Sequence, residues 1–165
     1  MQELQYLTFK LGNELFGLGI LHIKEIIEYE SVTHVPMMPE FIPGVINLRG
    51  NVVPVLDLNA RFYRKKSLIS RKSCIVIVEL LQNESKMDLG LLVDAVNEVV
   101  DIPPENVENA PSFGAKIRLD FVHGLGKLED RFVILLNIQQ VLNLEELSAL
   151  QAVTQAENSE PANNL

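Results

Sequence analysis

The sequence has one cysteine, three histidines and fewer basic than acidic residues, and each scarcity excludes a class of protein. Because Cys74 is alone, no intrachain disulfide can form, and its place in the apolar run SCIVIVEL favours a buried, unreactive thiol. His22, His34 and His123 have no mutual spacing that would chelate a metal from one helix or hairpin. The formal net charge of −8 argues against a nucleic-acid partner, which requires clustered lysines and arginines.

Long hydrophobic runs are also missing. No stretch approaches the roughly 18 apolar residues of a membrane span, so we expect no direct membrane insertion. The N-terminal residues MQELQYLTF have neither a basic region nor an uninterrupted apolar stretch, which argues against a signal peptide. These features favour a cytoplasmic protein.

Basic residues gather in one segment only, RFYRKKSLISRK at 61–72. Short charged segments are usually solvated, so we interpret this one as a solvated connector. The alternative is a patch that binds an anionic partner.

Motifs of catalysis and cofactor binding are not found. The sequence has no G-x-S-x-G elbow, no G-x-x-x-x-G-K-[ST] loop and no G-x-G-x-x-G opening a helix. Its carboxylates lie mostly in expected turns, and none is framed as an acid–base pair. We therefore expect no enzymatic activity, no cofactor and no metal, but a module that works through its surfaces. An enzyme stays an alternative because catalytic groups converge in space rather than in sequence.

The sequence repeats itself at a spacing of 80 residues. GVINLRGNVVPVLDLNARF (44–62) aligns without a gap with GLGKLEDRFVILLNIQQVL (124–142). Near the end of this block Asp57 faces Asn137, which is nearly isosteric. The identical pairs are Gly44 and Gly124, Leu48 and Leu128, Val53 and Val133, and Leu56 and Leu136.

A second pair of blocks precedes the first in both halves. FGLGILHIKEIIE (16–28) aligns with LGLLVDAVNEVVD (89–101) at a spacing of 73, which matches Glu25 with Glu98. Because the matching blocks follow the same order in each half, we infer an ancient tandem duplication.

The local patterns indicate a mainly β protein. QYLTFKL (5–11) alternates as a strand does, and SCIVIVEL (73–80) suits a central strand. Short strands with frequent turns, doubled by the duplication, predict two small β-barrels that meet along a seam. We expect a first subdomain at about 14–68 and a second at about 70–142, the latter joined by the strand at 5–11.

Two segments carry helical signals. Residues 20–28 have apolar side chains three and four apart, which suits one or two helical turns, although their β-branched content also allows a strand. Asn143 and Glu146 resemble a capping box that begins a helix from about 144 to 155. We expect a disordered tail at 156–165.

Arg49 stands at the expected hairpin turn, where nothing requires an arginine. Gly50 meets the need for positive φ, and the residue matching Arg49 in the second half is Glu129. Two hypotheses follow: Arg49 docks a partner, or it forms an internal salt bridge to Asp57 or Glu25. On a helical interpretation of 20–28, Glu25 faces water.

GVINLRG followed by PVLDL, preceded by IKEII and the loop VPMMPEFIPG, resembles the CheW family of bacterial chemotaxis coupling proteins. The resemblance covers roughly residues 3–150 as a single domain, and the later blocks of the second half agree in order and spacing. It implies two intertwined, five-stranded, SH3-like barrels with short helices and a C-terminal helix, acting as a scaffold without catalysis. The implied partners are the cytoplasmic signalling tip of chemoreceptors and the regulatory domain of a CheA-type histidine kinase, at receptor arrays on the inner face of the membrane.

The resemblance also assigns a receptor-binding surface. The arginine of NLRG is Arg49 and the glutamate of IKEII is Glu25, with Ile23 and Val45 as apolar companions. In the family, the receptor helix lies in an apolar groove near the seam of the subdomains. The chain departs from the family pattern at Asn59, where arginine is frequent, and at Asn137, where aspartate is frequent.

Two alternatives remain open at this point. One is an adaptor of a non-flagellar chemosensory pathway, such as pilus-based motility. The other is a small-ligand-binding β-barrel protein, which would require a deep polar pocket at the seam instead of a shallow apolar groove.

Overall fold

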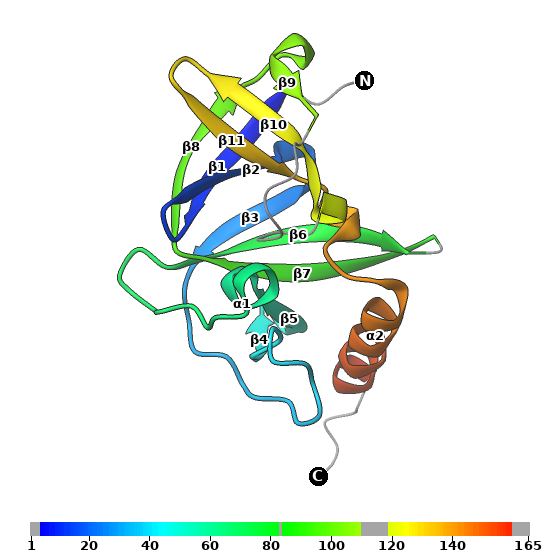
Figure 1. The fold of residues 1–165 in the computed structure, drawn as a ribbon. Helices are drawn as coiled ribbons and strands as arrows, with labels where there is room; N and C mark the ends of the chain where they lie inside the picture. Colours follow the sequence, from blue (N-terminus) through cyan, green and yellow to red (C-terminus); the bar gives the residue numbers. More distant parts are fainter. Residues whose placement is uncertain (1–3, 83, 110–118, 160–165) are drawn as a thin grey trace.

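The computed structural model describes residues 4–82, 84–109 and 119–159, and its strands form two sheets (Figure 1). The strands are β1 (Gln5–Leu11), β2 (Glu14–Gly19), β3 (Ile23–Glu28), β4 (Gly44–Leu48), β5 (Asn51–Asp57), β6 (Cys74–Gln82), β7 (Ser85–Val93), β8 (Ala95–Asp101), β9 (Val107–Glu108), β10 (Val122–Leu128) and β11 (Arg131–Leu136). The helices are α1 (Leu58–Tyr63) and α2 (Leu144–Ser159), with short 3-10 turns η1 (Ile20–His22), η2 (Pro104–Asn106), η3 (Leu119–Phe121) and η4 (Ile138–Gln140).

The two sheets exchange hairpins between the copies of the repeat. The five-stranded sheet has the order β3-β6-β7-β5-β4, and the six-stranded sheet has the order β8-β1-β2-β11-β10-β9. Each sheet thus joins the first hairpin of one copy to the later strands of the other. The strand at 5–11, β1, therefore lies in the sheet of the second-half strands together with β2, while β6 and β7 lie in the sheet of the first-half strands.

The duplication is visible in the strand register. Gly44 pairs with Val55 in the β4–β5 hairpin, and Gly124 pairs with Leu135 at the same place in the β10–β11 hairpin. The second strand of each hairpin pairs in parallel with a strand that contains glycine. In the first half β5 pairs with β7, where Val55 lies beside Gly90, and in the second half β11 pairs with β2. A Cβ at Gly90 would lie 2.7 Å from Ile75, so this close strand packing needs glycine.

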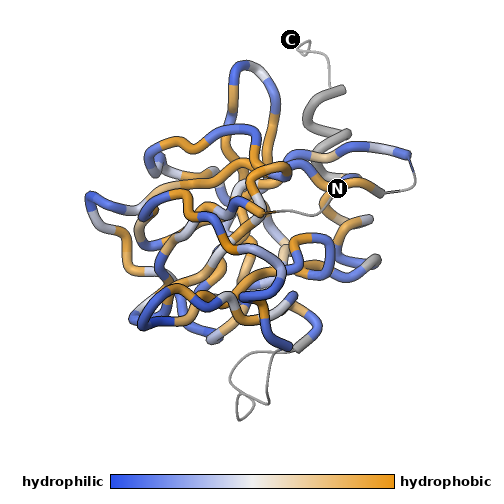
Figure 2. Tube along the Cα trace, turned by 90° about the horizontal axis from the view of Figure 1, so that it is seen from above, coloured by the Kyte–Doolittle hydropathy of each residue, from blue (hydrophilic) through white to orange (hydrophobic). Residues whose placement is uncertain are grey.

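Three hydrophobic clusters hold the fold together. The largest contains Phe9, Phe16, Val76 and Leu89 and fills the space between the two sheets. A second lies against the opposite face of the five-stranded sheet, and a third against that of the six-stranded sheet. Since every strand of the five-stranded sheet supplies a residue to the second cluster, that sheet curls around its own core. Figure 2 shows hydrophobic stretches through the interior and hydrophilic residues at the turns.

Residues 23–28 form strand β3, so the helical interpretation of this segment is wrong. The side chains alternate, with Ile27 half-buried and Ile26 43% exposed. The equivalent segment of the second half is strand β8. β-Branched side chains lose little freedom in a strand, and pairing with β6 satisfies the β3 backbone, so strand pairing overrides the helical spacing.

The C-terminal helix begins as predicted. The Asn143 side chain accepts from the Glu146 backbone N–H at 2.7 Å, and the Glu146 carboxylate accepts from the Asn143 N–H at 2.8 Å. The helix continues to Ser159, so it includes the start of the expected tail, and residues 160–165 lie outside the described part. No helix in the described ranges is both long and apolar enough to cross a membrane. The prediction of a mainly β fold with short helices and a C-terminal helix is confirmed.

Candidate functional site

The β4–β5 turn holds Arg49 in a left-handed backbone conformation. Its φ is 51° and that of Gly50 is 89°, and the Gly50 N–H donates to the Asn47 side chain at 2.9 Å. Positive φ at both central residues is the signature of a type I′ hairpin turn, which favours Asn-Gly. Glu129 in the second half also has positive φ, 34°. Both turns therefore place a charged residue in this conformation, with opposite charge.

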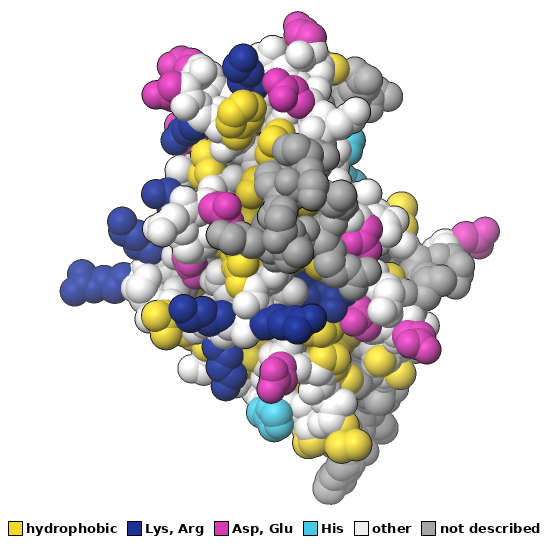
Figure 3. Space-filling model, viewed as in Figure 1, with side chains coloured by type: hydrophobic (Ala, Val, Ile, Leu, Met, Phe, Trp, Pro, Cys, Tyr) yellow, Lys and Arg dark blue, Asp and Glu magenta, His cyan; other side chains and the backbone are white. Residues whose placement is uncertain are grey.

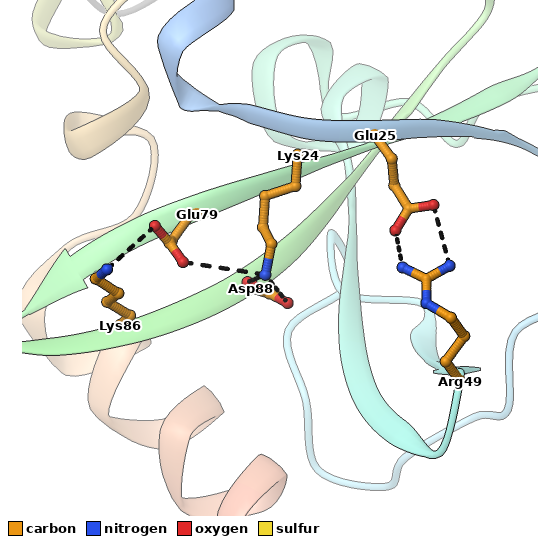
Figure 4. Close-up of polar contacts among 6 residues, drawn as sticks. All are labelled: Lys24, Glu25, Arg49, Glu79, Lys86 and Asp88. Carbon is orange, nitrogen blue, oxygen red and sulfur yellow. Dashed lines mark hydrogen bonds and ion pairs between the residues drawn. The ribbon is translucent and has the colours of Figure 1, made fainter.

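Arg49 and Glu25 form a two-pronged ion pair. Arg49 Nη1 donates to Glu25 Oε1 at 3.3 Å, and Nη2 donates to Oε2. Figure 4 shows Glu25 projecting from β3 toward the guanidinium on the turn. Since β3 and β4 are the two edges of the five-stranded sheet, the pair ties one edge to the hairpin at the other. Of the internal partners considered from the sequence, Glu25 is the one that the structure selects.

The pair is ordered yet accessible. The hydrogen bond from Arg49 lowers the pKa of Glu25, and the bond to Glu25 raises the pKa of Arg49, so both groups stay charged near neutral pH. The Arg49 side chain is 70% exposed and that of Glu25 is 28% exposed. A guanidinium carries five N–H donors, so the exposed ones remain available to a carboxylate on a partner.

Asp57 has a separate role, at the start of α1. Its carboxylate accepts from the Ala60 N–H at 3.3 Å as the N-cap, and from the Ser67 N–H at 2.9 Å. The side chain is 5% exposed, so its carboxylate serves these internal hydrogen bonds and does not face a partner.

Ile23 and Val45, the predicted apolar companions, are both half-buried. Ile23 packs against the large core between the sheets. Val45 lies in β4, where its backbone exchanges hydrogen bonds with Thr33 at 2.8 and 2.9 Å. The structure thus brings Arg49 and Glu25 together, while Ile23 packs on the core between the sheets and Val45 pairs with Thr33.

A second charged network lies beside the first. Lys24 donates to Asp88 at 3.1 Å and lies 4.0 Å from Glu79, which in turn lies 4.0 Å from Lys86 (Figure 4). These side chains are all at least partly exposed, and such surface pairs are individually weak. They add polar groups of both signs next to the Arg49–Glu25 pair.

Exposed aliphatic residues border the seam between the sheets. Ile26 on edge strand β3 is 43% exposed, and Val99 on edge strand β8 is 51% exposed. The two edge strands approach each other at Cys74. This residue pairs with Glu28, the last residue of β3, and its thiol contacts the backbone of Val96 on β8. Burial raises the pKa of the Cys74 thiol, which keeps it protonated and unreactive.

Sequence reasoning missed Arg61, which is not part of a solvated connector. Its guanidinium lies between Phe41, at 4.3 Å from the ring centroid, and Phe121, at 5.0 Å. It also donates to both carboxylate oxygens of Glu146, at 3.1 and 3.0 Å, and to the Val141 carbonyl at 2.9 Å. The repeat alignment contained a signal that Arg61 is not solvated, because Arg61 aligns with Val141, which is apolar and therefore expected to be buried.

The seam is occupied by side chains. Among the described residues the space between the sheets holds the largest hydrophobic cluster, including Phe9, Phe16 and Leu91. A hollow of about 1180 Å³ also opens beside α1, and Glu14, Arg61 and Phe121 are among the residues that line it. Within the same ranges, no three His, Cys, Asp or Glu side chains are grouped so as to hold a metal ion.

Comparisons with known proteins agree with the resemblance. The profile of the CheW-like domain family matches residues 5–146. The chain is 33% identical over 152 residues to the chemotaxis protein CheW of Klebsiella aerogenes, covering 92% of this chain and 89% of that protein. It is 27% identical over 149 residues to CheW of Treponema pallidum, covering 90% and 88%. The crystal structure of the scaffolding protein TtCheW from Thermoanaerobacter tengcongensis superposes with a TM-score of 0.77 at 36% identity, covering 88% of this chain and 92% of that one.

The family match spans most of the chain, and the solved structure shares its fold. The chain therefore belongs to the CheW family, whose members are non-catalytic scaffolding proteins of chemotaxis.

Proposed function

We propose that this scaffold couples the cytoplasmic tips of chemoreceptors to a CheA-type histidine kinase, at receptor arrays on the inner face of the membrane. The receptor side would bind at the Arg49–Glu25 pair, with Ile23 and Val45 as the apolar companions that the family resemblance implies. The observation that carries this proposal is an exposed guanidinium held in place by a glutamate on the edge strand β3.

The geometry suits an amphipathic helix. Its apolar face would cover exposed aliphatic side chains of the edge strands, such as Ile26 on β3 and Val99 on β8. A carboxylate at the edge of that face would pair with Arg49, and Glu25 would hold the guanidinium in register. The kinase side of the proposal rests on the family resemblance.

The test is a pull-down of the host's CheA-type kinase regulatory domain and receptor signalling fragment with the wild type and with Arg49→Glu. The variant places an acid beside Glu25, while Glu129 shows that the turn accepts one. We expect receptor capture to fall about tenfold or more while kinase capture is unchanged.

The matched control is Arg131→Glu, which reverses the charge of an arginine paired with Glu98 in the second half. It should leave receptor capture within about twofold of the wild type. Equal loss in both variants, or no loss in Arg49→Glu, would remove Arg49 from the receptor surface. A wild type that binds neither partner would overturn the coupling role.

A further inference from the structure

The loop that joins α1 to β6, residues 64–72, concentrates positive charge on an acidic protein. We call it the polybasic loop. Acidic residues outnumber basic ones by 22 to 14 in the whole chain, yet this loop contains no carboxylate. In Figure 3, Lys and Arg side chains protrude from the left of the molecule, where Figure 1 draws this loop. Its cations, all exposed, are Arg64, Lys65, Lys66, Arg71 and Lys72.

Most of the other described cations are paired, but these five are not, and neither are Lys10 and Lys127. None of the five forms an ion pair with a described carboxylate, whereas Lys24, Arg49, Arg61, Lys86 and Arg131 all do. Like charges held this close repel one another, which favours binding of an opposite charge over leaving the loop bare.

Two aliphatic side chains stand in the middle of the loop. Leu68 is 85% exposed and Ile69 is 48% exposed, with cations on both sides in sequence. Single exposed apolar side chains are common on protein surfaces, but these two are adjacent and flanked by cations, so a binding surface here would gain apolar contact from them.

The loop is also held in one shape. The Ser67 hydroxyl donates to Asp57 at 2.6 Å, and the Asn59 side chain donates to the Ser67 oxygen at 2.8 Å and to Asp94 at 2.9 Å. Further along, the Ser70 N–H donates to the Ser73 hydroxyl at 2.8 Å. A loop fixed in advance loses less entropy when it binds.

A hollow of about 680 Å³ lies beside the loop, between α1 and the β1–β2 turn. Tyr63, Lys65, Lys66 and Leu68 line it, together with the carboxylates of Glu14 and Asp94. The cations thus stand at the rim of a space that can take an apolar side chain.

We propose that the polybasic loop is a docking site for an acidic protein segment that carries aliphatic residues. Its carboxylates pair with the five cations, and an aliphatic side chain packs on Leu68 at the hollow. An anionic bilayer is also negatively charged, as an acidic segment is, but it extends across the whole face of the protein. The rest of this chain, whose net charge is −8, would repel it. A protein segment confines its charge to the loop. The site is separate from the Arg49–Glu25 pair and does not depend on the coupling role.

The test measures binding of a fluorescent helical peptide of about 20 residues, with glutamates on one face and leucines on the other, by anisotropy. We expect Lys65→Glu/Lys66→Glu to weaken binding about tenfold or more, and binding of the wild type to fall as salt rises. The matched control, Lys86→Glu/Lys127→Glu, makes the same change in net charge away from the loop and should stay within about twofold.

The apolar part has its own pair of variants. Leu68→Ser should weaken peptide binding about threefold or more, whereas Leu81→Ser, at a leucine 59% exposed elsewhere, should not. Circular dichroism checks that all variants fold. Equal binding by loop and control variants would overturn the proposal, as would binding to phosphatidylserine vesicles with none to the peptide. Receptor capture in the Arg49 experiment is a separate readout, so the two proposals can fail independently.

Discussion

In the first half of the chain, a glutamate on β3 meets an arginine at the β4–β5 turn. In the second half, the equivalent glutamate on β8, Glu98, meets Arg131, two positions past the turn residue that matches Arg49. The first pair is two-pronged with its glutamate 28% exposed, whereas the second spans 3.7 Å with its glutamate 64% exposed. A strand glutamate tied to a hairpin arginine is thus common to both halves, and only the first half presents the arginine at the turn itself.

The segments after the two hairpins show a second contrast. The Asp57 N–H donates to the Phe41 carbonyl and the Asn137 N–H to the Phe121 carbonyl, both at 2.8 Å. Asp57 then caps α1, while no side-chain cap bond begins η4 at Asn137. The same backbone frame therefore carries a helix where the residue is an aspartate and a single 3-10 turn where it is an asparagine. The charge of aspartate at a helix N-terminus is one physical reason.

The largest effect should come from the cores that the two halves share. Val55 and Leu135 are repeat partners with no exposed area, each facing the core of its own sheet. We expect Val55→Asp and Leu135→Asp each to cost about 4 kcal/mol or more, measured by urea unfolding, because each buries an unpaired charge. A stable variant in one half alone would show that the two cores are not equivalent.

A smaller effect is expected where the halves differ, at Arg61. Arg61→Met should cost about 2–4 kcal/mol, because Glu146 then loses its partner in a partly buried site. Adding Glu146→Gln should recover part of the loss in the same urea measurement. Arg64→Met removes an exposed neighbour and should change stability by less than about 0.5 kcal/mol. An Arg61 variant as stable as this control would contradict the structural role.

The smallest effect concerns pH. Arg49 lowers the pKa of Glu25 from its ordinary 4.5, so the pair stabilises the fold fully above that value and less as pH falls through the lowered pKa. The melting temperature of the wild type should therefore exceed that of Glu25→Gln near neutral pH, and the gap should close on acidification. A gap that widens in acid would contradict the pairing. The gap should also vanish in an Arg49→Gln background.

Sequence reasoning predicted most of the local structure but only part of the pairing between copies. The spacing of 80 residues correctly predicted two equivalent hairpins, and Asn143 with Glu146 correctly marked the start of α2. The sequence-based subdomains already joined the strand at 5–11 to the second half, where β1 pairs with β8. The exchange of both complete first hairpins was not predicted, because two copies with one hydrophobic pattern fit either sheet equally well.

The candidate site was predicted in the same partial way. Glu25 was identified as one of two internal partners of Arg49, but only the curl of the five-stranded sheet brings the two edges together. Arg61 was assigned to a solvated segment because charge patterning along a chain does not show which cation has aromatic rings on both sides.

The exchange of hairpins sets an order for folding during synthesis. All strands of the five-stranded sheet lie between residues 23 and 93, so that sheet can close once β7 has left the ribosome. The β1–β2 hairpin is made first but must wait for β8 and β11, which are made much later. Such long-range pairing slows folding. The earliest part of the nascent chain is therefore among the last to find its partners.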